Sequence, residues 1–136
     1  LEQTSTVETI VCIGRREPDD LLEALMDMQP LHKMEYAQYL PGELEKVFVD
    51  VEAVFLAVGT SRRNEEVAED IERLGISEGF SKHLQAVDYN VTATVVKAAA
   101  ASGVKYVARV SSLGADPERK EDWGGMPAVY FQWQGK

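Results

Sequence analysis

The chain has 136 residues, of which 45% are hydrophobic and 27% are charged, a composition typical of one globular domain with a sizeable core. No stretch approaches the roughly 18–20 consecutive apolar residues that a transmembrane helix needs, so we expect no membrane span. The formal net charge of −9 argues against nucleic acid as a partner, because an acidic surface repels phosphate groups.

Cysteine and histidine offer little chemistry in this chain. Cys12 is the single cysteine and cannot form an internal disulfide, which fits a reducing compartment. We therefore expect the cytoplasm or an organelle matrix, such as the mitochondrial one, and not secretion. His32 and His83 have no cysteines or paired carboxylates at ligand spacing, so no metal site is predicted. Both histidines are expected to be solvated, as is the charged run at residues 65–73.

Short apolar stretches alternate with a helical pattern in the first part of the chain. Residues 7–13 are predicted to form a strand, because β-branched residues recur there and a glycine follows. A proline then begins an amphipathic helix over residues 18–28. Residues 34–40 are predicted to form a second short strand, and residues 43–48 one or two helical turns.

The second part of the chain has the clearest strand and the clearest helix. Residues 53–58 are apolar on both faces, which predicts a central parallel strand covered by helices on both sides. After a charged helix over residues 64–74, six apolar residues recur at steps of three or four along one long helix: Phe80, Leu84, Val87, Val91, Val95 and Ala98. A strand at residues 104–110 follows directly, and this strand–helix–strand order is typical of a βαβ unit.

The rest of the chain is predicted to be a polar loop over residues 116–126 and the start of a helix at Pro127. The alternation of strands and helices predicts an α/β fold with a doubly wound, Rossmann-like parallel sheet that is incomplete. We interpret residues 1–136 as part of one nucleotide-binding domain.

Small and polar residues follow the three clearest strands. In doubly wound folds, ligands bind at the carboxyl ends of the strands. Glycines and hydroxyl side chains at these ends let backbone and side-chain groups approach a ligand closely. We therefore predict that a nucleotide cofactor contacts residues from all three ends: Gly14, Arg15, Arg16, Gly59, Thr60, Ser61 and Ser111.

The arginine pair Arg15-Arg16 bears on the choice of cofactor. The residue after the second strand of a dinucleotide fold binds the ribose 2′-hydroxyl if it is acidic, whereas an arginine accommodates a 2′-phosphate. The pair therefore favours NADP(H) over NAD(H), although two solvated arginines at a strand exit would look the same. A glycine-rich phosphate loop would lie about 20 residues earlier. We thus expect residues 1–3 to end a first helix whose strand and glycine loop precede this sequence.

Several motifs follow one another along the chain, at residues 54–61 (VFLAVGTS), 79–80 (GF), 87–89 (VDY), 98–99 (AA), 102–105 (SGVK) and 111–116 (SSLGAD). In this order they resemble the atypical short-chain dehydrogenases/reductases of the Tat-interacting-protein oxidoreductase type, over nearly the whole chain. The resemblance implies an NADP-dependent oxidoreductase that acts on a small carbonyl or alcohol compound. It also implies that the substrate-binding half follows these residues.

The resemblance further implies which residues catalyse the reaction. In that family a serine after this strand and a Tyr-x-x-x-Lys motif catalyse hydride transfer to or from a carbonyl. Ser112 takes the place of the serine, with Ser111 as a substitute, and Tyr130 takes that of the tyrosine. The tyrosine is the acid/base and the serine holds the carbonyl oxygen, while the lysine stabilises the tyrosinate and binds the cofactor ribose.

Gln134 stands where the motif has its lysine. A neutral amide can hydrogen-bond a ribose but supplies no charge, so we expect cofactor binding with doubtful catalysis. Lys136 lies about 200° further round a helix and cannot take the lysine's place. This departure keeps a second hypothesis open, a non-catalytic accessory or scaffold subunit of a larger assembly. If these residues are the whole protein, a partner must cover the apolar edge of the incomplete sheet.

Overall fold

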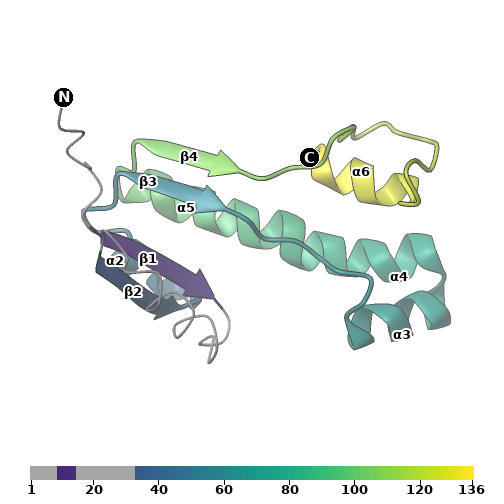
Figure 1. Cartoon of the computed structure of the whole chain (residues 1–136), viewed down its shortest axis with the longest axis horizontal. Coiled ribbons are helices and arrows are strands. Elements are labelled where there is room, and N and C mark those ends of the chain that lie inside the picture. Colours follow the sequence, from purple (N-terminus) through teal and green to yellow (C-terminus); the bar gives the residue numbers. More distant parts are fainter. Residues whose placement is uncertain (1–8, 15–32) are drawn as a thin grey trace. The chain divides into compact units, whose positions relative to one another are not determined.

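The computed structural model describes residues 9–14 and 33–136 of the chain (Figure 1). The chain divides into two compact units, Leu1–Val47 and Phe48–Lys136. The described strands form two separate sheets of two parallel strands each, where the sequence predicts one sheet. The protein is therefore a mixed α/β structure with parallel strands. Across the described ranges, every helix falls short of the length and hydrophobicity that crossing a bilayer requires.

The first unit contains one of the two sheets. β1 (Thr9–Gly14) pairs in parallel with β2 (Lys33–Gln38), which confirms both predicted strands. A 3₁₀ turn, η1 (Pro41–Glu43), and a single helical turn, α2 (Leu44–Val47), follow. The proline suits the first position of such a turn because it lacks an N–H to leave unpaired. The predicted helix over residues 18–28 lies outside the described residues.

The second unit is built on a βαβ connection. β3 (Ala53–Leu56) pairs in parallel with β4 (Tyr106–Arg109), as the sequence predicts. Four helical segments connect these strands: α3 (Glu65–Leu74), α4 (Ile76–His83), η2 (Leu84–Val91) and α5 (Thr92–Ala101). A last helix, α6 (Ala128–Gln134), follows β4 after a loop, again as predicted. Parallel strands need such a long crossover connection, which the helices supply.

The charged helix α3 begins and ends at residues suited to helix termini. The side-chain oxygen of Asn64 accepts a hydrogen bond from the Val67 N–H at 3.4 Å, which caps the first turn. Gly75 ends the helix at a φ of 84°, where other residues would be strained. The prediction that the charged residues of this run form a solvated face is confirmed except at Asp70, which is buried together with Val67. Ile71 on the same helix is half-buried and packs against the core.

The long helix predicted from the apolar stripe is divided by a π-helical segment. Helical dihedral angles continue through His83 and Thr92, so α4, η2 and α5 follow one another without a break (Figure 1). Phe80, Leu84 and Asp88 recur at steps of four and have no exposed surface. Side chains four residues apart lie on the same face of a helix, so these three share one face.

The core of the second unit joins its helices. Val67, Phe80 and Leu84 form a buried cluster, against which partly buried side chains pack: Ile71, Met126, Val129, Tyr130 and Trp133. The rings of Phe80 and Tyr130 stack with their centroids 6.2 Å apart. These contacts hold α6 against α4 and η2 and so fix the position of the residues that α6 carries.

One face of the β3–β4 pair is open, contrary to the prediction that helices cover both faces. The register pairs Ala53 with Tyr106 and Phe55 with Ala108, so these side chains share a face. On it, Phe55 is 81% exposed and Tyr106 is 69% exposed. Leu56 points to the other face and is buried. The apolar character of this strand therefore does not reflect burial on both sides within the described residues.

Candidate functional site

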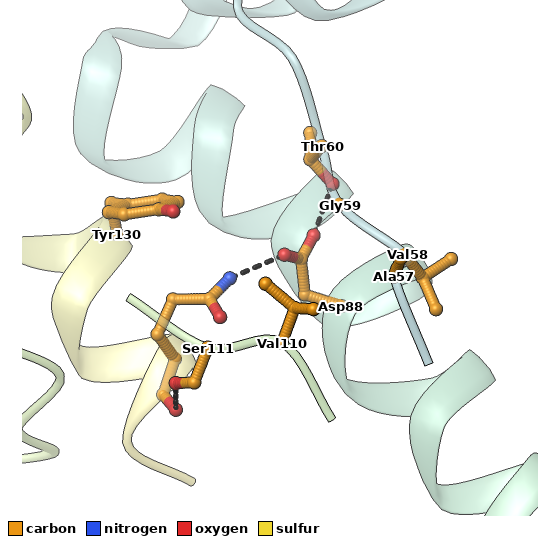
Figure 2. Close-up of a pocket in the computed structure, with 9 residues that line it drawn as sticks. Ala57, Val58, Gly59, Thr60, Asp88, Val110, Ser111 and Tyr130 are labelled. Carbon is orange, nitrogen blue, oxygen red and sulfur yellow. Dashed lines mark hydrogen bonds between the residues drawn. The ribbon is translucent and has the colours of Figure 1, made fainter. Parts of the chain in front are cut away.

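A cavity of about 220 Å³ lies where β3 and β4 end, at their carboxyl ends (Figure 2). Nine described residues line it: Ala57, Val58, Gly59, Thr60, Asp88, Val110, Ser111, Tyr130 and Gln134. They come from the segments that follow the two strands, from η2 and from α6. This is the end of the strands at which the sequence predicts a ligand site.

Thr60 and Asp88 join the segment after β3 to the π-helical segment η2. The hydroxyl of Thr60 lies 2.5 Å from the Asp88 carboxylate and 3.2 Å from the carbonyl oxygen of His83, and it is the donor to both. Asp88 has no exposed surface, and its carboxylate points towards Thr60 (Figure 2). A buried charge needs such hydrogen bonds to be tolerated. The pair thus fixes the wall that Gly59 and Thr60 form.

Of the two serines after β4, the structure brings Ser111 to the cavity and not Ser112. The backbone N–H of Val110 donates to the Leu56 carbonyl at 2.8 Å, so the chain still follows β3 as it reaches Ser111. The Ser111 hydroxyl then lies 3.4 Å from the carbonyl oxygen of Gln134, to which it donates. The Ser112 hydroxyl donates to the carbonyl of the next residue at 3.5 Å. Ser111 is therefore the better placed of the two.

Gln134 is a structural link as well as a lining residue. Its side-chain nitrogen donates to Asp88 at 2.5 Å, and its side-chain oxygen accepts from Arg109 at 3.0 Å. The residue is 7% exposed. The amide therefore joins η2 to the end of β4 through both of its polar atoms. Lys136 lies apart from this link, with its Nζ 3.8 Å from the centre of the Trp133 ring.

Asp88 lies within the long helix and not at the end of a strand, so the sequence patterns assign it no role beyond its place in the VDY motif. One signal does mark it. Asp88 lies four residues after Leu84 and three before Val91, so it falls on the apolar stripe of the long helix. A charged residue on such a stripe must find partners inside the protein. Arg109 was not predicted as a site residue either, because a polar residue at the end of an apolar strand is common and indicates no partner.

Other predicted site residues are not among the nine described residues that line this cavity. Ser61 lies one residue beyond the lining segment, where its hydroxyl accepts a hydrogen bond from the Arg63 N–H at 3.2 Å. Gly14 ends β1, which belongs to the first unit. Arg15 and Arg16 lie outside the described residues, so the 2′-phosphate clamp stays a prediction.

A second polar cluster surrounds Asp70, on α3. Its carboxylate accepts hydrogen bonds from Lys82 at 2.7 Å, from Arg73 and from the ring of His83 at 2.8 Å. The hydrogen bonds from Lys82, Arg73 and His83 hold the pKa of Asp70 well below its usual range. The expectation that His83 is solvated is wrong, since its side chain is only 16% exposed. The cluster ties α3 to α4.

The loop between β4 and α6 is held by Arg119. Its guanidinium lies 5.4 Å from the centre of the Trp123 ring and 4.8 Å from that of Phe131, and it donates to the Gly114 carbonyl at 3.2 Å. Stacking of a guanidinium on aromatic rings adds to these hydrogen bonds. The two segments that bring Ser111 and α6 to the cavity are thereby fixed to each other.

Within the part of the chain that the structure describes, no group of three or more histidine, cysteine, aspartate or glutamate side chains could hold a metal ion. Comparison of the chain with family models, curated proteins and solved structures finds no match. The geometry of the cavity and the residues around it therefore carry the functional argument.

Proposed function

We propose that this protein is an NADP(H)-binding relative of the short-chain dehydrogenases/reductases, with weak catalysis on a small carbonyl or alcohol compound. One observation carries the proposal. Residues that the sequence argument assigns to the cofactor and to catalysis, from three separate segments, line one cavity: Gly59, Thr60, Ser111, Tyr130 and Gln134. A reducing compartment, the cytoplasm or an organelle matrix, would suit such a protein.

The strand pairing supports a doubly wound sheet. In the dinucleotide-binding order 3-2-1-4-5-6, the second strand neighbours the third and the fourth neighbours the fifth. The parallel pairs β1–β2 and β3–β4 match these two neighbour pairs. The first strand of the order has no counterpart among the described residues. On this proposal, that is why the strands form two sheets.

The cavity is large enough for the reactive end of a dinucleotide but too small for the whole molecule. Its volume of about 220 Å³ is below the roughly 300–1,000 Å³ of pockets that enclose drug-sized ligands, so it holds one ring with its substituents. Gly59 and Thr60 would contact that end, and Arg15 and Arg16 would bind a 2′-phosphate. Gln134 is not expected to hold the cofactor ribose as the motif lysine does, because the oxygen and nitrogen of its amide already bond to Arg109 and Asp88.

Two hydroxyl groups would act on the substrate. Tyr130 would give a proton to the carbonyl oxygen, and Ser111, in place of Ser112, would donate a hydrogen bond to the same oxygen. NADP(H), when bound, supplies or accepts the hydride. None of the nine described lining residues is cationic, so nothing in the wall stabilises a tyrosinate. We therefore expect very slow turnover at neutral pH and faster turnover in alkaline solution.

Cofactor binding is the first test. Titration of the protein with NADPH and with NADH, followed by fluorescence, should show tighter binding of NADPH. Replacing both Arg15 and Arg16 with alanine should weaken NADPH binding at least about tenfold, a loss of about 1.4 kcal/mol, and change NADH binding little. An equal loss for both cofactors would exclude the arginines as selectors. Absence of binding to either cofactor would refute the proposal.

Turnover is the second test. NADPH consumption with a panel of small carbonyl compounds should be negligible at pH 7, should rise towards pH 10, and should disappear in Tyr130→Phe. Gln134→Lys should raise the rate or move its rise to lower pH, because it places an ammonium in the cavity wall. Fast, Tyr130-dependent turnover of the unaltered protein at pH 7 would show that the missing lysine does not limit catalysis.

A second candidate function is a non-catalytic accessory or scaffold subunit. The open face of the β3–β4 pair favours it, because Phe55 and Tyr106 lie exposed on it. Exposed apolar surface of this kind marks sites where another element or protein packs. This function predicts a stable complex with a partner, detected by co-purification, and no turnover of NADPH at any pH.

A further inference from the structure

Arg109 places a cation on the inner face of the β3–β4 pair. The register sets it opposite Leu56, which is buried, so the two side chains share a face. The other residues of the pair on this face are apolar, Val54 and Val107. A charged side chain in such surroundings needs a hydrogen-bond partner within the protein. Among the described residues, the guanidinium donates to the side-chain oxygen of Gln134, at 3.0 Å.

Arg109 determines which way the Gln134 amide points. A guanidinium carries donors only, so it can bond to the oxygen of an amide but not to the nitrogen. Because the oxygen faces Arg109, the nitrogen faces Asp88, to which it donates. The hydroxyl of Ser111 also donates to the backbone carbonyl of Gln134, at 3.4 Å. The side chain at position 134 must therefore offer an acceptor towards the end of β4.

A lysine at position 134 would not meet this requirement. An ammonium has donors and no acceptor, as a guanidinium does. It would leave Arg109 without its partner in partly buried surroundings, and the two cations would repel each other across a medium of low dielectric constant. Glutamine reaches the same place and supplies an oxygen. The chain thus departs from the Tyr-x-x-x-Lys motif at the residue that Arg109 contacts.

We propose that Arg109 is a positioning residue that excludes a lysine from position 134 and so keeps a cation away from Tyr130. The cation of this region then belongs to β4, one side chain outside the cavity wall, instead of to α6 within the wall. Arg109 acts through Gln134 and contacts no substrate. The inference rests on the proposed function, because it accounts for the missing lysine of that motif. Positions 109 and 134 must change together before an ammonium is stable in the wall.

Urea unfolding of the full chain tests the exclusion. Gln134→Lys is compared with Gln134→Met, which also removes the amide oxygen but adds no charge. When Arg109→Gln, a neutral donor and acceptor, accompanies each, the ratio of the two unfolding equilibrium constants should shift at least about tenfold in favour of lysine. Arg109→Lys keeps the charge and should leave the ratio unchanged. Arg109→Met is the second neutral replacement if Arg109→Gln fails to fold. A ratio that is the same with a neutral and a cationic residue at position 109 would overturn the proposal.

The ionisation of Tyr130 tests the consequence for the cavity. Tyrosinate differs from tyrosine in its ultraviolet absorption, and subtraction of the matching Tyr130→Phe variant isolates this residue in a pH titration. Gln134→Lys combined with Arg109→Gln should move the ionisation to lower pH by about one unit or more relative to Arg109→Gln alone, because an ammonium then lies in the wall. Gln134→Lys with Arg109 retained should move it less. An equal shift in both, or no shift in either, would contradict the role of Arg109. Neither measurement needs a cofactor, so a failure of NADPH to bind would refute the proposed function and leave this inference to be decided by these two results.

Discussion

Asp70 and Asp88 are both buried carboxylates of the second unit, but the charges of their partners differ. Asp88 accepts hydrogen bonds from a hydroxyl and an amide, whereas Asp70 accepts them from Lys82, Arg73 and His83. The cationic partners favour the ionised form of Asp70 and so lower its pKa. A pKa that differs between the folded and unfolded states makes stability depend on pH.

For Asp70 the sign of this dependence follows from the direction of the shift. The pKa of Asp70 in the folded state is lower than its value of about 3.9 in the unfolded state. The hydrogen-bonded carboxylate therefore adds to the free energy of unfolding at pH values above about 3.9. The contribution is lost as the pH falls through the folded-state pKa. Asp70→Asn should therefore lower the Tm at pH 7. The difference in Tm between this variant and the unaltered protein should shrink as the pH falls from about 4 to about 2.

Thermal unfolding followed by circular dichroism between pH 2 and 7 measures this difference. The effect should be modest, because the side chains of Arg73 and Lys82 are 65% and 60% exposed. Glu69→Gln, which removes a neighbouring exposed carboxylate, should change the Tm little at any pH. A difference between Asp70→Asn and the unaltered protein that is the same at pH 2 and pH 7 would contradict the argument.

At the scale of elements, α3 and α4 are in close contact at Gly79. A Cβ atom at this position would lie 2.6 Å from the backbone nitrogen of Ile71 and closer still to the carbonyl group of Asp70. Backbone atoms cannot move aside as a flexible side chain can. The close approach also brings Lys82 and His83 of α4 to Asp70 of α3, so packing and charge pairing depend on the same glycine.

Gly79→Ala should therefore destabilise the second unit by about 1–3 kcal/mol, the usual cost of overpacking, although alanine is the better helix former. Urea unfolding would show the change as a lower midpoint. Gly42→Ala is the matched control, because a Cβ atom there would meet nothing within 4 Å. If Gly79→Ala were as stable as the control, the two helices would have room to separate and the close contact would not matter.

At the scale of the whole molecule, the described residues of each unit form a sheet of two strands. Two strands alone are marginally stable, so packing of α4, η2 and α6 must contribute much of the stability of the second unit. Its sheet nevertheless leaves Phe55 81% exposed and Tyr106 69% exposed on one face. This face is the surface at which we expect self-association or the binding of another protein.

Phe55→Thr should reduce self-association in sedimentation velocity and the binding of a hydrophobic dye. It should change the free energy of unfolding by no more than about 0.5 kcal/mol, because the ring is exposed and threonine suits a strand. Val49→Thr removes another exposed apolar side chain, 65% exposed, from outside the strand pair and serves as the control. Equal effects of the two substitutions would mean that the β3–β4 face has no special role.

Much of the second unit follows from local patterns. The strand–helix–strand order, the helix that begins after Asn64 and the helix that follows Pro127 all depend on neighbours in sequence, as do capping and turn chemistry. The meeting of Thr60 and Ser111 could also be anticipated, because parallel strands end at the same edge of a sheet. These features can be predicted from the spacing of the apolar residues and from the capping and turn residues that interrupt it.

Local patterns thus predicted the parallel α/β character of the chain and the end of the strands at which the cavity lies. Contacts across the fold were needed to show that Ser111 and not Ser112 lines this cavity, that Gln134 bonds to Asp88 and Arg109, and that one face of β3 is open. Periodicity reports which residues share a face of one element. Burial of a particular carboxylate and the partner of a particular amide depend on which elements pack together, and that is a property of contacts between residues far apart in the chain.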